Sequence, residues 1–212
     1  MTKKSRLLVV TAVAAEAEAV RAGADPDHVV VEPVGVGPAA AAAGTARLLA
    51  TGTYRAVISA GIAGGFPGRA PVGATVLGVR SICADLGAES PDGFLSIEEL
   101  GFGTSHVAAD SELIKELSTA LPDAITGDVL TLSTVTGTSA TADRLAAAFP
   151  DAVAEAMEGF GVATAAQDLT IPFAELRTIS NPIGPRDRAA WRLKEAFAAL
   201  STASAALWTT CG

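Results

Sequence analysis

Short apolar runs alternate with helix-like segments along the whole chain. Six runs rich in Val, Ile and Leu predict buried strands, and they are Leu7–Val13, Val29–Val34, Ala56–Ser59, Thr75–Val79, Val129–Leu132 and Phe173–Ile179. Five segments between and after them predict helices, at Ala39–Ala50, Ser111–Ala120, Thr141–Phe149, Glu158–Gln167 and Arg188–Leu207. Strands that alternate with helices are typical of an α/β fold. We therefore expect a three-layer α/β/α sandwich around a central mixed sheet.

One polar segment, from Asp85 to Gly103, interrupts this alternation. It is rich in turn-forming residues and has no clear period. Long segments of this kind usually run over the surface and often cover a ligand. We expect a long surface loop here.

The first residues of the chain allow two interpretations. A basic stretch, an apolar run from Leu7 to Ala15 and small residues are also typical of a secretory signal. However, Glu16 and Glu18 follow at once, and a second strand-like run begins near His28. The pattern therefore favours a first buried strand, with Glu16 opening a helix. No apolar run approaches the roughly 18–20 residues that span a bilayer.

Size and charge limit the classes of function. A length of 212 residues fits a single domain over residues 1–212. The net charge of -8 argues against nucleic acid as a partner, because phosphate backbones require a positive surface. Cys83 and Cys211 lie far apart with no metal-ligand spacing, so we expect reduced thiols in a cytoplasmic protein and no metal site.

Two glycine-rich segments could approach a ligand with their backbone. The first, Gly35–Ala40, fits the dinucleotide pattern Gly-x-Gly-x-x-Ala, but no acidic residue occurs between Pro33 and Ala84 to bind a ribose. Pro38 as a helix-opening residue explains this segment without a ligand. The second, Ser59–Phe66, ends a strand in glycines and lacks the Gly-Lys-Ser/Thr ending of a triphosphate loop.

Two carboxylates stand out from their surroundings. Glu16 follows the first predicted strand, where it could also be a solvated helix-start residue favoured by the helix dipole. Glu158 is flanked by Ala, Val and Gly, so it should be partly buried and need partners. An ionised carboxylate accepts hydrogen bonds from sugar hydroxyls, although backbone amides at a helix start would also serve. Glu18 should face away from Glu16 and be solvated.

The segment Ala156-Met157-Glu158-Gly159, followed by a strand that ends at Asn181, resembles the nucleoside phosphorylase and nucleosidase superfamily. This resemblance implies that Glu158, with Met157, binds the ribose. It also implies that Glu16 is the general base that activates water, and that the side chain at position 181 handles the purine. The turn at 61–66, with Ala63 and Gly64, would then line the ribose and the nucleophile.

The run from Ser180 to Trp191 is similar to that of the futalosine hydrolases, which release hypoxanthine from a nucleoside with a benzoate tail. The amide of Asn181 suits a 6-oxopurine, whereas adenine-releasing relatives carry an acid there. The resemblance implies a homo-oligomer that uses no cofactor or metal. The remaining candidate site residues are Asp187 as a possible acid, Arg186 and Arg188 as benzoate ligands or surface cations, and Val135 and Thr136 in the base pocket.

Three alternatives remain open from the sequence. Ile62 lies where related enzymes often have a hydroxyl, which favours water over phosphate, but Arg69 keeps a purine nucleoside phosphorylase possible. An adenosine-type nucleosidase, acting on methylthioadenosine or aminofutalosine, is the second alternative. A non-catalytic nucleoside-binding relative is the third. His28, His106 and Trp191 receive no role in the site.

Overall fold

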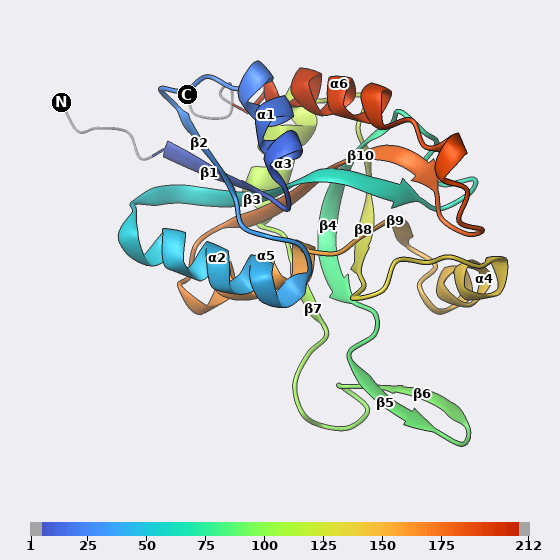
Figure 1. The fold of residues 1–212 in the computed structure, drawn as a ribbon. Helices are drawn as coiled ribbons and strands as arrows, with labels where there is room; N and C mark the ends of the chain where they lie inside the picture. The colour runs from blue at the N-terminus through green and yellow to red at the C-terminus, as the bar shows by residue number, and fades with distance from the viewer. Residues whose placement is uncertain (1–5, 208–212) are drawn as a thin grey trace.

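An eight-stranded mixed sheet forms the centre of the computed structural model, which describes residues 6–207 (Figure 1). The strands follow the order β10-β4-β8-β9-β3-β1-β2, with β7 paired to β4. Their bounds are β1 (Arg6–Thr11), β2 (Val29–Pro33), β3 (Tyr54–Gly65), β4 (Thr75–Cys83), β7 (His106–Ala108), β8 (Ile125–Thr131), β9 (Ala152–Ala156) and β10 (Phe173–Pro182).

Half of this sheet closes on itself. β3 pairs with β10 in parallel, and its last residues, Gly64 and Gly65, pair with β9 in the antiparallel sense. The pairings therefore run in a ring from β3 through β10, β4, β8 and β9 back to β3. β1 and β2 extend from β3 as an open wing. Because the ring closes at the end of β3, the ends of β3, β9 and β10 meet in one place.

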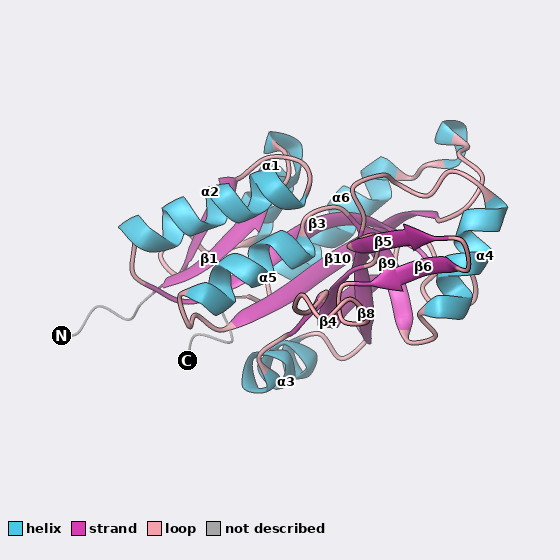
Figure 2. Cartoon of the chain, turned by 90° about the horizontal axis from the view of Figure 1, so that it is seen from below, coloured by secondary structure: helices cyan, strands magenta, loops and turns pink. Residues whose placement is uncertain are grey.

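Helices cover both faces of the wing. Leu7 and Val9 of β1 pack in one cluster with α1 (Ala14–Gly23), α3 (Ser111–Ala120) and α6 (Leu193–Ser204). Leu8 and Val10 pack on the other face with α2 (Pro38–Thr51) and α5 (Gly159–Asp168), which lie side by side (Figure 2). Successive strand residues point to opposite faces. The four apolar residues from Leu7 to Val10 are therefore buried on both faces, and the helices on both sides of the sheet confirm the predicted α/β/α sandwich with a central mixed sheet.

The remaining helix, α4 (Ser139–Ala148), covers the closed half of the sheet. Its Ala142 and Leu145 pack with Phe66, Ile82 and Leu130. No helix in residues 6–207 combines the length and apolar character that crossing a membrane would require.

The six predicted strands and five predicted helices are present, with shifted bounds. β3 continues past Ser59 to Gly65, and the helix predicted over Arg188–Leu207 is a short 3-10 turn, η1 (Arg188–Ala190), followed by α6. The extended backbone of Trp191 separates the two helical pieces. The helix near Glu16 begins at Ala14 rather than at the glutamate. β7 and β9 have no counterpart among the predicted strands.

The expected surface loop at 85–103 contains a hairpin. Its strands are β5 (Gly87–Ser90) and β6 (Gly93–Ser96), and they project from the body of the molecule (Figure 1). Cys83, just before it, is buried and carries a free thiol, whereas Cys211 lies outside the described residues.

Candidate active site

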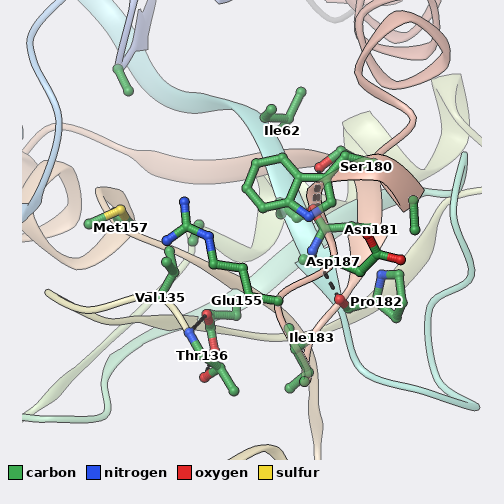
Figure 3. Close-up of a pocket in the computed structure, with 18 of the residues that line it drawn as sticks. Ile62, Val135, Thr136, Glu155, Met157, Ser180, Asn181, Pro182, Ile183 and Asp187 are labelled. Carbon is green, nitrogen blue, oxygen red and sulfur yellow. Dashed lines mark hydrogen bonds between the residues drawn. The ribbon is translucent and has the colours of Figure 1, made fainter. Parts of the chain in front are cut away.

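A cavity of about 300 Å³ opens where the ends of β3, β9 and β10 meet (Figure 3). With one exception, Arg188, every site residue predicted from the sequence lines it; these are Glu16, Ala63, Gly64, Val135, Thr136, Met157, Glu158, Asn181, Arg186 and Asp187. No residue of the 85–103 segment is part of this lining. Side chains separated by up to 171 positions, from Glu16 to Asp187, thus share one pocket.

Glu16 is held at the cavity by three backbone amides. Its Oε2 accepts from Ala12 N at 3.0 Å and Val13 N at 3.3 Å, and its Oε1 accepts from Ile62 N at 2.9 Å. Burial raises the pKa of Glu16, as does the neighbouring Glu158, while Arg177 and the Ile62 amide oppose the rise. Glu16 lies in the first turn of α1, but the alternative of a solvated helix-start residue is wrong, because Glu16 is only 4% exposed and lines the cavity.

The close approach of Glu16 to β3 requires a glycine at position 61. A Cβ there would lie 2.5 Å from Glu16 Oε1 and 2.9 Å from an Arg177 guanidinium nitrogen. A side chain at position 61 would force both groups to shift, so Gly61 leaves room beside β3 for the Glu16 carboxylate and the Arg177 guanidinium.

Glu158 lies at the start of α5 and is 6% exposed. Its Oε1 accepts from Gly37 N at 3.2 Å, and its Oε2 accepts from Met157 N at 3.3 Å. The same Oε2 is 3.6 Å from Nη1 of Arg177. The backbone amide of Gly37, in the first glycine-rich segment, thus helps to orient Glu158. Glu158 also lines the cavity and has lone pairs left for a ligand.

A buried arginine, Arg177, was missed by the sequence analysis as a site residue. Its Nε donates to Glu175 Oε1 at 2.9 Å and its Nη2 donates to Ser59 Oγ at 3.0 Å. Burial lowers the pKa of Arg177, but the surrounding Glu175, Glu158 and Glu16 raise it by more. The guanidinium of Arg177 therefore interacts electrostatically with three buried carboxylates. Burial raises the pKa of one of them, Glu175.

Asn181 ends β10 at the cavity with part of its hydrogen-bonding capacity free. Its Oδ1 lies 2.8 Å from Ser180 Oγ, and its Nδ2 donates to Pro182 O at 2.9 Å. A carboxamide has two N–H donors and two acceptor lone pairs. One donor and one lone pair therefore remain for a ligand.

Glu155 of β9, unlike Arg177, lines the cavity, and the sequence analysis missed it too. It is 5% exposed, its Oε1 accepts from Thr136 N at 2.7 Å, and its Oε2 accepts from the Thr136 hydroxyl. Burial raises the pKa of Glu155, and the two hydrogen bonds from Thr136 oppose the rise. Figure 3 shows Glu155 and Thr136 together on the wall below Val135.

The segment after β10 forms the exposed rim. Arg186 lines the cavity and Arg188 does not, although both guanidinium carbons are 5.9 Å from the centre of the Trp191 ring. Asp187 lines the cavity and also accepts from Ala189 N at 3.0 Å, which caps η1. Trp191, given no role from the sequence, is part of the lining.

Arg69 makes its hydrogen bonds to backbone carbonyls and does not line the cavity. Its guanidinium donates to the carbonyls of Ala146, Phe149 and Ala152 at 2.8–2.9 Å, so it ties the end of α4 to β9. In the described part of the chain, no group of three or more His, Cys, Asp or Glu side chains is arranged to hold a metal ion.

Comparisons with known proteins identify the family of this chain. The family model described as the phosphorylase superfamily matches residues 12–211. A futalosine hydrolase from Streptomyces coelicolor is 49% identical, with 93% of this chain and 92% of that protein covered. A futalosine hydrolase from Acidothermus cellulolyticus is 47% identical, with 92% and 90% covered.

A solved structure supports the fold. It is a 5'-methylthioadenosine/S-adenosylhomocysteine nucleosidase from Colwellia psychrerythraea in complex with adenine, with a TM-score of 0.83 at 21% identity, covering 98% of this chain and 96% of that one. With a whole-chain family match and near-50% identity to two relatives, the chain belongs to the phosphorylase superfamily and, within it, to the futalosine hydrolases.

Proposed function

We propose that this protein hydrolyses the N-glycosidic bond of futalosine and releases hypoxanthine and dehypoxanthine futalosine, a step in the futalosine route to menaquinone. The observation that carries the proposal is the meeting of Glu16, Glu158 and Asn181 around one cavity. The two carboxylates can activate water and bind the ribose, and the carboxamide can bind a 6-oxopurine.

In the proposed reaction, Glu16 acts as the general base. Cleavage of an N-glycosidic bond develops positive charge at the anomeric carbon, and a water must be deprotonated as it attacks that carbon. Burial makes the Glu16 carboxylate a stronger base than an exposed one, and three backbone amides fix its direction. The water oxygen bonds to the anomeric carbon, its proton passes to Glu16, and the C–N bond electrons leave with the base.

Glu158 and Arg177 have complementary roles in this proposal. Glu158 accepts hydrogen bonds from the ribose hydroxyls, and its orientation is set by Gly37 N and by Arg177. The positive charge of Arg177 opposes the rise that burial causes in the pKa of Glu16 and of Glu175. The departing purine is stabilised by hydrogen bonding to Asn181, and Asp187 at the rim is the candidate proton donor.

Water is the proposed nucleophile rather than phosphate. Ile62 presents an aliphatic side chain to the cavity, and Arg69, which had kept the phosphorylase alternative open, donates to three backbone carbonyls instead. Arg177 is surrounded by three carboxylates. A phosphate dianion beside Glu16 and Glu158 would be repelled.

The test is an incubation of the protein with futalosine in phosphate-free buffer containing EDTA. We expect hypoxanthine in the chromatogram at a rate that added phosphate does not raise. A strict requirement for phosphate would establish a phosphorylase, and preferential release of adenine from aminofutalosine would establish an adenosine-type nucleosidase. Binding of nucleosides without any turnover would establish a non-catalytic relative.

The assembly and location of the protein are part of the same proposal. We propose a cytoplasmic homo-oligomer that binds a small nucleoside. The free thiol of Cys83 fits a reducing compartment. Sedimentation analysis of the purified chain tests the oligomer, and a monomeric species with full activity would contradict it.

A further inference from the structure

The mechanism does not use one fully buried acid, Glu175. It lies inside β10 and is not part of the cavity lining. Its neighbours in the strand, Ala174 and Leu176, point to the opposite face and pack in the apolar cluster with α3 and α6. A buried carboxylate is costly unless its oxygens find donors, so its place in the core needs a physical reason.

Both oxygens of Glu175 accept hydrogen bonds from side chains. Oε1 accepts from Arg177 Nε at 2.9 Å, and Oε2 accepts from the hydroxyl of Ser81 on β4. Burial raises the pKa of Glu175, while Arg177 and the Ser81 hydroxyl oppose that rise. Two donors that face one carboxylate favour its ionised form.

Two glycines make room for this carboxylate. A Cβ on Gly159, the first residue of α5, would overlap Glu175 Oε2. On β4, a Cβ on Gly78 would lie 3.0 Å from Glu175 Cβ. Gly159 directly follows Glu158, so the carboxylate of Glu175 lies beside the helix start that carries the proposed ribose-binding residue.

Arg177 is held at two of its three guanidinium nitrogens. Glu175 and Arg177 are two positions apart in the strand, so their side chains share one face. Nε of Arg177 donates to Glu175, and Nη2 donates to Ser59 Oγ at 3.0 Å. Because a guanidinium is planar and rigid, fixing Nε and Nη2 also fixes the direction of Nη1.

The third nitrogen, Nη1, faces the two carboxylates of the proposed mechanism. It lies 3.6 Å from Glu158 Oε2. A Cβ on Gly61 would lie 2.9 Å from Nη1 and 2.5 Å from Glu16 Oε1, so both groups approach the same point of β3. The direction of Nη1 therefore bears on the residue proposed for the ribose and on the proposed base.

We infer that Glu175, held by Ser81, is a positioning residue that fixes the direction of Arg177 Nη1. Nη1 then stays directed at Glu158 and at Glu16. This inference rests on the proposed function, in which Glu16 is the general base. Since Glu175 does not line the cavity, it acts on the reaction through Arg177 and not by touching the substrate.

Glu175 also limits the effect of the Arg177 charge on Glu16. The charged groups that face Glu175 and Arg177 are Glu158 at the start of α5 and Glu16 on α1, whereas β3 and β4 contribute serine hydroxyls. The positive charge of Arg177 lowers the pKa of Glu16, and a negative Glu175 offsets part of that charge. Removing the negative charge should therefore make Glu16 a weaker base.

The experiment measures the pH dependence of kcat/KM on futalosine for Glu175→Gln and for wild type. Gln has nearly the same shape and keeps an acceptor for Arg177 Nε, but it carries no charge. We expect the acid limb to move to lower pH by at least about half a unit, because Glu16 loses a negative neighbour. We also expect kcat to fall at least about threefold, because a weaker base removes the proton from water less well.

Asp128→Asn is the matched control. Asp128 is 3% exposed, accepts from Arg80 through both oxygens and does not line the cavity. Its replacement should lower the melting temperature while the acid limb stays in place. An acid limb that stays in place in folded Glu175→Gln, or that moves equally in Asp128→Asn, would overturn the inference.

Ser81→Ala keeps every charge and tests the inference if Glu175→Gln does not fold. Loss of the hydroxyl leaves Glu175 free to turn away from Arg177, so kcat/KM should fall at least about threefold in the wild-type background. The loss should be smaller in the Glu16→Gln background, because part of the effect passes through Glu16. Equal losses in both backgrounds would show a structural role alone and contradict the inference. A wild-type protein that does not hydrolyse futalosine, or that requires phosphate, would instead count against the proposed function.

Discussion

The backbone N–H of Ile62 donates to Glu16 Oε1 at 2.9 Å and ties the first turn of α1 to the cavity end of β3. The other oxygen of Glu16 accepts from Ala12 N and Val13 N. Both oxygens are therefore directed by backbone, and the carboxylate cannot rotate without losing a hydrogen bond. This fixed direction is what a general base needs.

Replacing Glu16 by Gln should lower kcat by about 100-fold or more, the usual scale for a lost general base. The amide has only one acceptor oxygen, so at least one of the three backbone N–H partners of Glu16 will face an N–H. We expect a stability loss of about 1–3 kcal/mol from that unpaired donor. Single-turnover kinetics and thermal denaturation measure the two effects separately.

Glu18→Gln is the matched control, since Glu18 lies on the same helix with its side chain exposed. Its activity and melting temperature should equal those of wild type. Hypoxanthine binding to Glu16→Gln should remain within about threefold of wild type. A variant at position 16 that keeps the wild-type rate would remove Glu16 from the mechanism.

The pH dependence of kcat/KM should reveal the environment of Glu16. Burial raises its pKa above the ordinary value of 4.5. A general base works only when ionised, so activity should be present above the raised pKa and fall as the pH drops through it. The acid limb of the profile is therefore expected above pH 4.5, and it should be absent from the residual activity of Glu16→Gln. Circular dichroism across the same range shows whether the fold persists, and an acid limb at or below 4.5 in folded protein contradicts this prediction.

Asn181→Asp should shift the base preference from hypoxanthine toward adenine. A carboxylate can accept from an exocyclic amine and repels O6, whereas the amide donates to O6. We expect the ratio of kcat/KM values to move by at least about tenfold. Equimolar competition between futalosine and aminofutalosine measures this ratio directly. An unchanged ratio in a folded variant would discredit the base-recognition role of this residue.

Arg186 and Arg188 form a natural pair for testing benzoate binding. Both lie beside Trp191, but only Arg186 lines the cavity. Arg186→Ala should raise KM for futalosine by roughly 3- to 10-fold, because a charge-assisted hydrogen bond to the carboxylate is lost. The KM for inosine, which lacks the benzoate, should not change. Arg188→Ala should leave both constants as they are, and equal losses on both substrates would return Arg186 to a purely surface role.

Much of the fold and part of the site were accessible from the sequence. Apolar runs located the six predicted strands because a strand covered on both faces is mostly apolar. The likeness around Met157-Glu158 and Asn181 predicted residues that the structure places in the lining of one cavity. The charges Glu175 and Arg177, two positions apart within an apolar run, were a signal of a buried ion pair that the sequence analysis did not use.

Other features depended on segments that meet only in three dimensions. The run of Ala, Val and Glu at 152–156 has the composition of a helix, yet it is the strand β9 because β3 and β8 pair with it. Strand pairing places both Glu155 and Asn181 opposite Gly64. The packing of the segment after β10 decides that Arg186 lines the cavity and Arg188 does not. The sequence thus determined which chemical groups are available and where six of the strands lie. Closure of the sheet decided which of those groups face one cavity, because the burial and neighbours of a charge are set by residues far away in sequence.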